Sequence, residues 1–220
     1  EKNGIEYGIN TNFSKYKQIK PRYLKVSIDA TSAEQYEEFR GVKPDKYFEM
    51  INHIKEYRAW QKVSGHDTTL GIQSLVMDEG HAEKFYLAHR DLDVDYMVFR
   101  PVESVAQFYN PQKAKNIMKE IEQLHQIDER VMMNYKWEML TNTFKECFAA
   151  WSVITVNWNG MVQYCCHKPH EVVGHVLDPD ILEKKKRYRT NMKTCESPCR
   201  LSGSNAFMES INVGGHNAFV

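Results

Sequence analysis

The sequence lacks several features that point to particular classes of protein. Its 29 Lys and Arg residues are balanced by 29 Asp and Glu residues, whereas nucleic-acid binding requires an excess of positive charge. No apolar run approaches the ~18 residues needed to span a bilayer, and the first residues lack the order of a signal peptide. We therefore expect no nucleic-acid partner, no membrane partner and a cytoplasmic location.

Cysteine is absent from the first two thirds of the chain, and the five cysteines all fall between Cys147 and Cys199. An odd number, with Cys165 and Cys166 adjacent, does not suit a disulfide framework. Thiols gathered in this way are more often metal ligands, because neighbouring thiolates need a cation close by. The pattern predicts a metal site formed by Cys147, Cys165, Cys195 and Cys199. Spacing alone suits zinc and an iron–sulfur cluster equally.

Hydrophobic periodicity divides the first half of the chain into alternating strands and helices. Strands are expected over residues 4–12, 23–30, 68–77 and 96–100, and helices over residues 31–41, 45–60 and 81–89. Strands and helices that alternate at this rhythm form βα units with a parallel sheet. The predicted fold class is therefore α/β.

The pattern changes near residue 110. Asn110 and Pro111 are preferred at the start of a helix, and an apolar stripe extends the predicted helix over residues 111–140. We expect three parts: residues 1–110 form the α/β part, residues 111–140 a bridging helix, and residues 141–220 a small cysteine-containing module.

Within the last part, Asn159-Gly160 indicates a β-hairpin, with strands over residues 152–157 and 161–165. A short Lys-rich helix is expected after Asp178, with the basic run at residues 184–187 on a solvated face. The residues after Leu201 are rich in Gly, Ser and Asn, so we expect a loose tail.

Several motifs taken together resemble those of the radical S-adenosylmethionine (SAM) superfamily, in the branch with a SPASM or twitch auxiliary iron–sulfur module. The spacing Cys147-x12-Gly160-x4-Cys165 falls within the opening pattern of that module. Ser27-Ile-Asp-Ala, followed by Arg40-Gly41, is similar to the fourth strand and next helix of the family's barrel. Asn10-Thr-Asn is similar to the end of its third strand.

Some family motifs are absent or altered. No three cysteines have the Cys-x3-Cys-x2-Cys spacing, so we expect the chain to be the C-terminal part of a longer enzyme. The last pair, Cys195 and Cys199, is separated by three residues where the twitch pattern usually has two. The resemblance implies the C-terminal part of a partial (β/α)6 TIM-like barrel, followed by an α+β auxiliary-cluster module with a β-hairpin.

The resemblance also implies an activity. A reduced [4Fe–4S] cluster outside this chain would cleave SAM, and the resulting radical would take a hydrogen atom from a small-molecule or peptide substrate. A second [4Fe–4S] cluster on the four cysteines would handle substrate or electrons, and an external donor would supply electrons. The alternative is a non-catalytic zinc-binding interaction module with the same four ligands.

Candidate contact residues lie at the C-terminal ends of predicted strands, where βα barrels build their sites. Gln73 and Ser74 are polar residues within an apolar strand, and polar groups that are buried need partners. The alternatives are a cap or turn role for Asp29, turn formation for Asn10 and Asn12, and an exposed helix-end position for Arg40. The predicted SAM contacts are Asn10, Asn12, Ser27, Asp29, Arg40 and Ser74. The predicted substrate contacts are Arg100 and Glu103, with a strand-end ion pair as the alternative.

Overall fold

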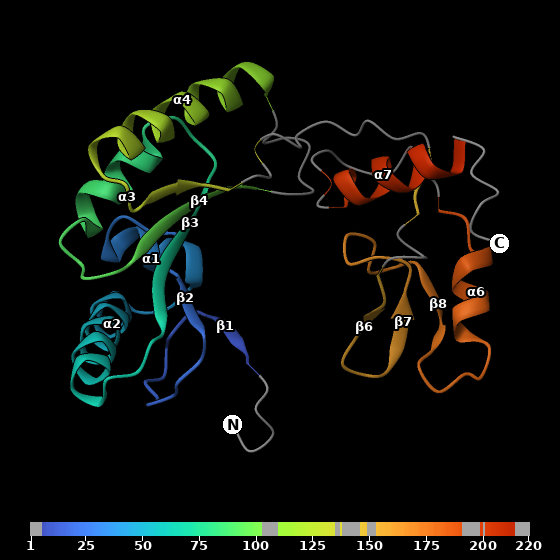
Figure 1. Ribbon diagram of the computed structural model, residues 1–220, viewed down its shortest axis with the longest axis horizontal. Coiled ribbons are helices and arrows are strands. Elements are labelled where there is room, and N and C mark those ends of the chain that lie inside the picture. The colour runs from blue at the N-terminus through green and yellow to red at the C-terminus, as the bar shows by residue number, and fades with distance from the viewer. Residues whose placement is uncertain are drawn as a thin grey trace. The chain divides into compact units, whose positions relative to one another are not determined.

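The computed structural model of the chain describes residues 6–102, 110–134, 137, 146–148, 153–190, 199 and 201–213. The chain divides into two compact units (Figure 1). The first comprises Glu1–Val102 and Asn110–Trp137, and the second comprises Glu103–Tyr109 and Glu138–Val220. No helix in the described ranges is long and apolar enough to cross a membrane.

The first unit is built on one parallel sheet. Its strands lie side by side in chain order, and every neighbouring pair is parallel. The strands are β1 (Gly8–Thr11), β2 (Tyr23–Ser27), β3 (Thr69–Val76), β4 (Tyr96–Pro101) and β5 (Val131–Met133). The α/β class and the parallel sheet expected from the periodicity are confirmed.

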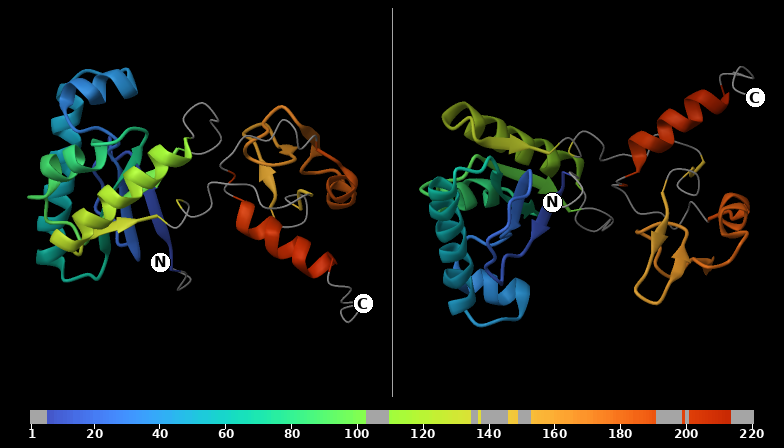
Figure 2. Two further views of the ribbon diagram at one scale, coloured as in Figure 1. Left: turned by 90° about the horizontal axis from the view of Figure 1, so that it is seen from above. Right: turned by 60° about the horizontal axis from the view of Figure 1, so that its bottom comes forward.

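Helices connect the strands and lie on one side of the sheet (Figures 1 and 2). They are α1 (Ala33–Arg40) and α2 (Asp45–Ser64) between β2 and β3, α3 (His81–His89) between β3 and β4, and α4 (Pro111–Ile127) between β4 and β5. Local signals set the ends of α1. The Ser32 side chain accepts from Gln35 N–H at the start, and Gly41 ends the helix with a φ of 63°, which suits glycine.

The two faces of the sheet differ, because successive side chains of a strand point to opposite faces. The helix-covered face is buried and, apart from Ser74, mainly apolar. It carries Leu24, Val26, Ile28, Leu70, Ile72, Met97 and Phe99. The opposite face, called the open face below, carries more polar residues that are partly exposed in several places. It includes Asn10, Lys25, Ser27, Gly71, Gln73, Val98 and Arg100.

Two expectations for the first unit were wrong. The helix predicted over residues 111–140 ends at Ile127, because Asp128 is extended and binds the Arg130 side chain. Val131 matched the helical spacing, but it is a strand residue paired beside Met97. The apolar residues at 4–12 predict a buried strand, whereas the residues of β1 are half-buried or exposed. β1 is an edge strand of the described sheet, with no neighbour on one side.

The second unit contains an antiparallel sheet in the order β6-β7-β8. Its elements are β6 (Thr155–Val156), β7 (Met161–Gln163), β8 (Val172–His175), α6 (Ile181–Arg187) and α7 (Ser202–Val213). The predicted hairpin between β6 and β7 is confirmed. Its turn is longer than Asn159-Gly160 alone, because Gly160 N–H donates back to Asn157 O over 3.1 Å. Gly160 has a φ of 81°, a conformation that favours glycine.

The expected loose tail is also corrected, since α7 occupies most of it. Asn205 is 1% exposed, and its side-chain oxygen accepts from Phe148 N–H over 2.6 Å. This contact joins α7 to the residues around Cys147, so tertiary hydrogen bonding stabilises a helix in a segment whose composition is typical of a loop.

Candidate functional site

The C-terminal ends of β2 and β3 meet at Asp29. Its backbone is left-handed, with a φ of 60°, which Asp tolerates better than most residues. Its carboxylate accepts from Leu75 N–H over 2.9 Å and from the Arg40 guanidinium over 2.6 Å. Two of the predicted SAM contacts, Asp29 and Arg40, therefore lie together where the strands end.

A second polar pair lies on the open face beside Asp29. Gln73 Nε2 donates to Ser27 Oγ over 2.7 Å. Gln73 is 7% exposed, and its Oε1 is buried without a hydrogen-bond partner among the described residues. A buried acceptor of this kind is expected to bind a donor, so the pair can receive a hydroxyl or N–H group of a ligand.

Ser74 lies on the helix-covered face. It is fully buried, and its Oγ is 2.8 Å from His81 Nε2. Burial lowers the pKa of His81, so the imidazole is kept neutral beside the hydroxyl. Ser74 therefore faces the opposite side of the sheet from Ser27 and Gln73.

Asn10 and Asn12 lie at and just after the end of β1. Asn10 is exposed on the open face, and the Asn12 side chain accepts from Ser14 N–H over 3.2 Å in a turn. Asn12 also borders a cavity of about 450 Å³. Polar residues that line this cavity are Asn12, Ser14, Tyr36, Arg40, Lys43, Lys46 and Glu49.

The predicted substrate contacts are placed only in part. Arg100 is half-buried near the end of β4, in register with Leu75 and on the same face as Val98. It is therefore on the open face with Ser27 and Gln73. Glu103 lies outside the described residues.

The second unit gathers thiols around Tyr164. Cys165 is 7% exposed and Tyr164 is 2% exposed, and Cys147 and Leu201 pack against the cluster that these two residues form. The Tyr164 hydroxyl donates to Cys147 O over 2.8 Å. Burial raises the pKa of the Cys165 thiol, so without a cation the thiol is kept protonated. Two of the four predicted metal ligands are brought together here.

Cys199 precedes Leu201 by two residues, and the Leu201 N–H lies 3.4 Å from Cys199 Sγ. Cys195 lies outside the described residues, and Cys166 is exposed. Within the described ranges, no group of three or more His, Cys, Asp or Glu side chains is arranged to hold a metal ion. The chemistry of the four predicted cysteine ligands nevertheless suits a metal centre, because thiolates bind zinc and iron–sulfur clusters.

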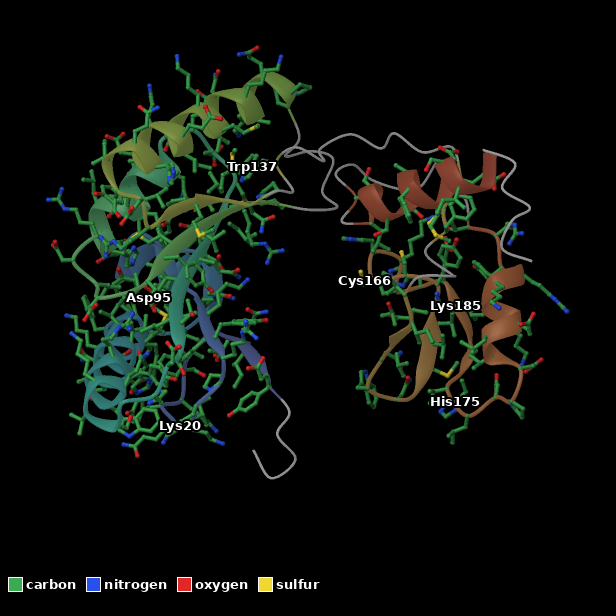
Figure 3. All side chains as sticks on the ribbon, in the orientation of Figure 1. Lys20, Asp95, Trp137, Cys166, His175 and Lys185 are labelled. Carbon is green, nitrogen blue, oxygen red and sulfur yellow. The ribbon has the colours of Figure 1, made fainter. Side chains whose placement is uncertain are left out.

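A buried cation beside these thiols was not expected from the sequence. Lys185 belongs to the basic run that was predicted to be solvated, yet it is 0% exposed. It extends from α6 toward the three-stranded sheet (Figure 3), and its Nζ donates to Val153 O over 2.5 Å. Burial lowers the pKa of Lys185, and the charges of Cys165 and Cys147 raise it. Helical spacing was the available signal, since one residue of such a run can face inward.

No protein-family model and no curated protein sequence matches the chain, but solved structures match it in fold. Native anSMEcpe with bound AdoMet (SAM) has a TM-score of 0.55 and 14% identity, covering 86% of this chain and 58% of that one. SuiB of Streptococcus suis bound to S-adenosylmethionine has a TM-score of 0.53 and 15% identity, covering 87% and 52%. The chain shares the fold of these two proteins.

A further structure is SuiB bound to its precursor peptide SuiA, with a TM-score of 0.54 and 14% identity, covering 87% of this chain and 52% of SuiB. The chain therefore spans between half and three fifths of the length of these proteins. Identity at this level establishes likeness of fold alone, and function is argued separately below.

Proposed function

We propose that this chain is the C-terminal part of a radical SAM enzyme. The observation that carries the proposal is the likeness of fold, over 86% of the chain, to a protein solved with SAM bound. The Asp29–Arg40 pair supports it, because it lies where the parallel strands end, the edge at which βα folds bind ligands.

The five parallel strands are proposed to be part of a (β/α)6 partial barrel. The helix-covered face is its outer wall, and the open face is its interior. Strands contributed from outside this chain would pair with β1, which is an edge strand among the described residues and would otherwise present unpaired backbone groups. The cysteines of the SAM-cleaving cluster are proposed to come from the same outside segment, since the Cys-x3-Cys-x2-Cys spacing is absent here.

The polar residues at the strand ends are proposed to hold SAM. The Arg40 guanidinium is suited to the SAM carboxylate, because planar N–H groups bind carboxylates in pairs. Ser27 and the buried Gln73 Oε1 are suited to the ribose hydroxyls, since Oε1 needs a donor. Asn10 and Asn12 extend the polar surface on the β1 side.

The four cysteines Cys147, Cys165, Cys195 and Cys199 are proposed to ligate an auxiliary [4Fe–4S] cluster. When bound, iron–sulfur clusters of this enzyme class supply the electrons for SAM cleavage or for handling the substrate. The contribution of this chain is to orient SAM and substrate and to supply the cysteine ligands, of which Cys165 is buried.

A peptide is the substrate class that we propose, with Arg100 and Glu103 as candidate contacts. SuiB binds a precursor peptide, and anSMEcpe with bound AdoMet and Kp18Cys peptide matches this chain with a TM-score of 0.50 and 14% identity, over 86% of this chain and 59% of that one. The reaction would also need an external electron donor and a reducing compartment such as the cytoplasm.

The proposal is tested by SAM cleavage. A longer protein that joins this chain to its upstream segment is purified without oxygen and incubated with SAM and dithionite, and 5′-deoxyadenosine is measured by chromatography. We expect product from the longer protein and none from residues 1–220 alone. Arg40→Met should weaken SAM binding by about tenfold, whereas Lys20→Met, in the loop between β1 and β2, should not. Turnover by the 220-residue chain, or none by the longer protein, would contradict the proposal.

A zinc-binding interaction module is the second candidate. Its support is the all-thiol donor set, because four cysteines are also the ligands of structural zinc sites. Purified protein that is colourless and contains zinc would favour this function, and brown protein that contains iron and sulfide would favour the first.

A further inference from the structure

The basic run of α6 contains lysines in opposite environments. Side chains of Lys184 and Lys186 are 44% and 55% exposed and pair with carboxylates on the surface. Lys185, between them, is 0% exposed. A lysine is almost never fully buried unless polar or negative groups surround its ammonium, and Val153 O is one such group.

The surroundings of the Lys185 ammonium lead to the thiols. Nζ lies 5.5 Å from the centroid of the Tyr164 ring, a cation–π distance. The hydroxyl of that ring donates to Cys147 O, and the next residue is Cys165, which packs in the same cluster. The Tyr164 side chain therefore contacts both the Lys185 ammonium and the backbone of Cys147, and Cys165 packs in the same cluster.

We propose that Lys185 is the fixed positive charge that stabilises the negatively charged thiolate–metal centre built on Cys147 and Cys165. This inference rests on the proposed metal centre. Thiolates around a metal or cluster carry net negative charge, and a buried cation stabilises that charge more strongly than an exposed one, because screening is weaker inside the protein. An added electron makes a cluster more negative, so Lys185 should favour the reduced state.

Four proteins test this role: the wild type, Lys185→Met, Lys185→Gln and Lys186→Met. The Met variant keeps the side-chain length without the charge, and the Gln variant also keeps a hydrogen-bond donor. The matched control, Lys186→Met, removes an exposed charge at the next position of the same helix. Circular dichroism and thermal unfolding first select the variant that folds as the wild type does.

The main readout is the midpoint potential of the reconstituted cluster, followed by electron paramagnetic resonance. We expect the charge-removing variants at Lys185 to lower the ratio of reduced to oxidised cluster by about tenfold at a fixed potential. This equals a shift of ~59 mV to more negative potential for one electron. Lys186→Met should match the wild type. A midpoint that is unchanged in the Lys185 variants overturns the proposal, as does an equal shift in the control.

A second readout separates this inference from the proposed function. If the wild type assembles no iron–sulfur cluster, the proposed function fails, and cobalt(II) binding to the same chain decides the role of Lys185. Thiolate-to-cobalt absorption should then show about tenfold weaker binding after loss of the Lys185 charge and no change in Lys186→Met. Equal cobalt affinities, or no cobalt binding by the wild type, overturn the proposal.

Discussion

Arg40 and Asp29 form an ion pair over 2.6 Å that joins the last turn of α1 to the end of β2. The other oxygen of the same carboxylate accepts from Leu75 N–H, near the end of β3. One side chain thus fixes the relative positions of two strand ends and a helix end. This is the rigid support that a ligand-binding edge requires.

Substitutions at Asp29 should separate its structural role from its charge. Asp29→Asn keeps an acceptor for Leu75 N–H and tolerates the left-handed backbone, so it should lower the free energy of unfolding by about 1 kcal/mol or less. Asp29→Ala loses the acceptor and fits that backbone poorly, and should lower it by about 2–3 kcal/mol. Urea unfolding measures both, and equal losses would contradict this division.

His89 should make the fold sensitive to acid. Its Nδ1–H donates to Phe85 O, so Nε2 accepts from the Tyr47 hydroxyl over 3.0 Å. Burial lowers the pKa of His89 from 6.5 to about 4. As the pH falls, His89 is protonated at a higher pH in the unfolded chain than in the folded chain. The stability contributed by this site is therefore lost as the pH falls from 6.5 toward 4.

The full loss from this site is about 3 kcal/mol, at ~1.4 kcal/mol for each pKa unit. Urea unfolding between pH 7 and pH 4.5 measures it for the wild type and for His89→Gln. The variant should be less stable at pH 7 and show a shallower dependence on pH. A parallel dependence in the two proteins would exclude His89 as the acid-sensitive group.

Glu120 of α4 should stabilise the start of α3. Its two carboxylate oxygens accept from Gly80 N–H over 2.7 Å and from Glu83 N–H over 2.8 Å. A carboxylate at this end of a helix also interacts favourably with the helix dipole. Glu120→Ala should lower the free energy of unfolding by about 1–3 kcal/mol. Glu122→Ala, exposed on the same helix, is the control and should change it by about 0.5 kcal/mol or less.

Elements with local signals could be predicted from the sequence. The helix predicted over residues 31–41 is α1, and Ser32 and Gly41 provide the local signals at its two ends. The end of α4 could not be predicted, because Val131 fits a helical stripe and a buried strand equally well. α7 was missed because its order depends on Asn205 contacting Phe148, a residue 57 positions away.

The same limit applies to the candidate site. The motif resemblance pointed to Asp29 and Arg40, which the structure brings together. It could not decide between Gln73 and Ser74, because neighbouring strand residues face opposite sides and the sequence does not say which side the helices cover. The burial of Lys185 could not be predicted, because it belongs to a run of like charges and only tertiary packing shows which residue of the run points inward.

The measurement that tests the central claim most directly is the iron and sulfide content of the 220-residue chain after anaerobic reconstitution. We predict brown protein with about four irons per chain. Cys147→Ala and Cys199→Ala should lose most of this iron, and Cys166→Ala, which changes an exposed thiol, should retain it. Colourless protein that contains zinc, or the same iron content in all three variants, would contradict the account.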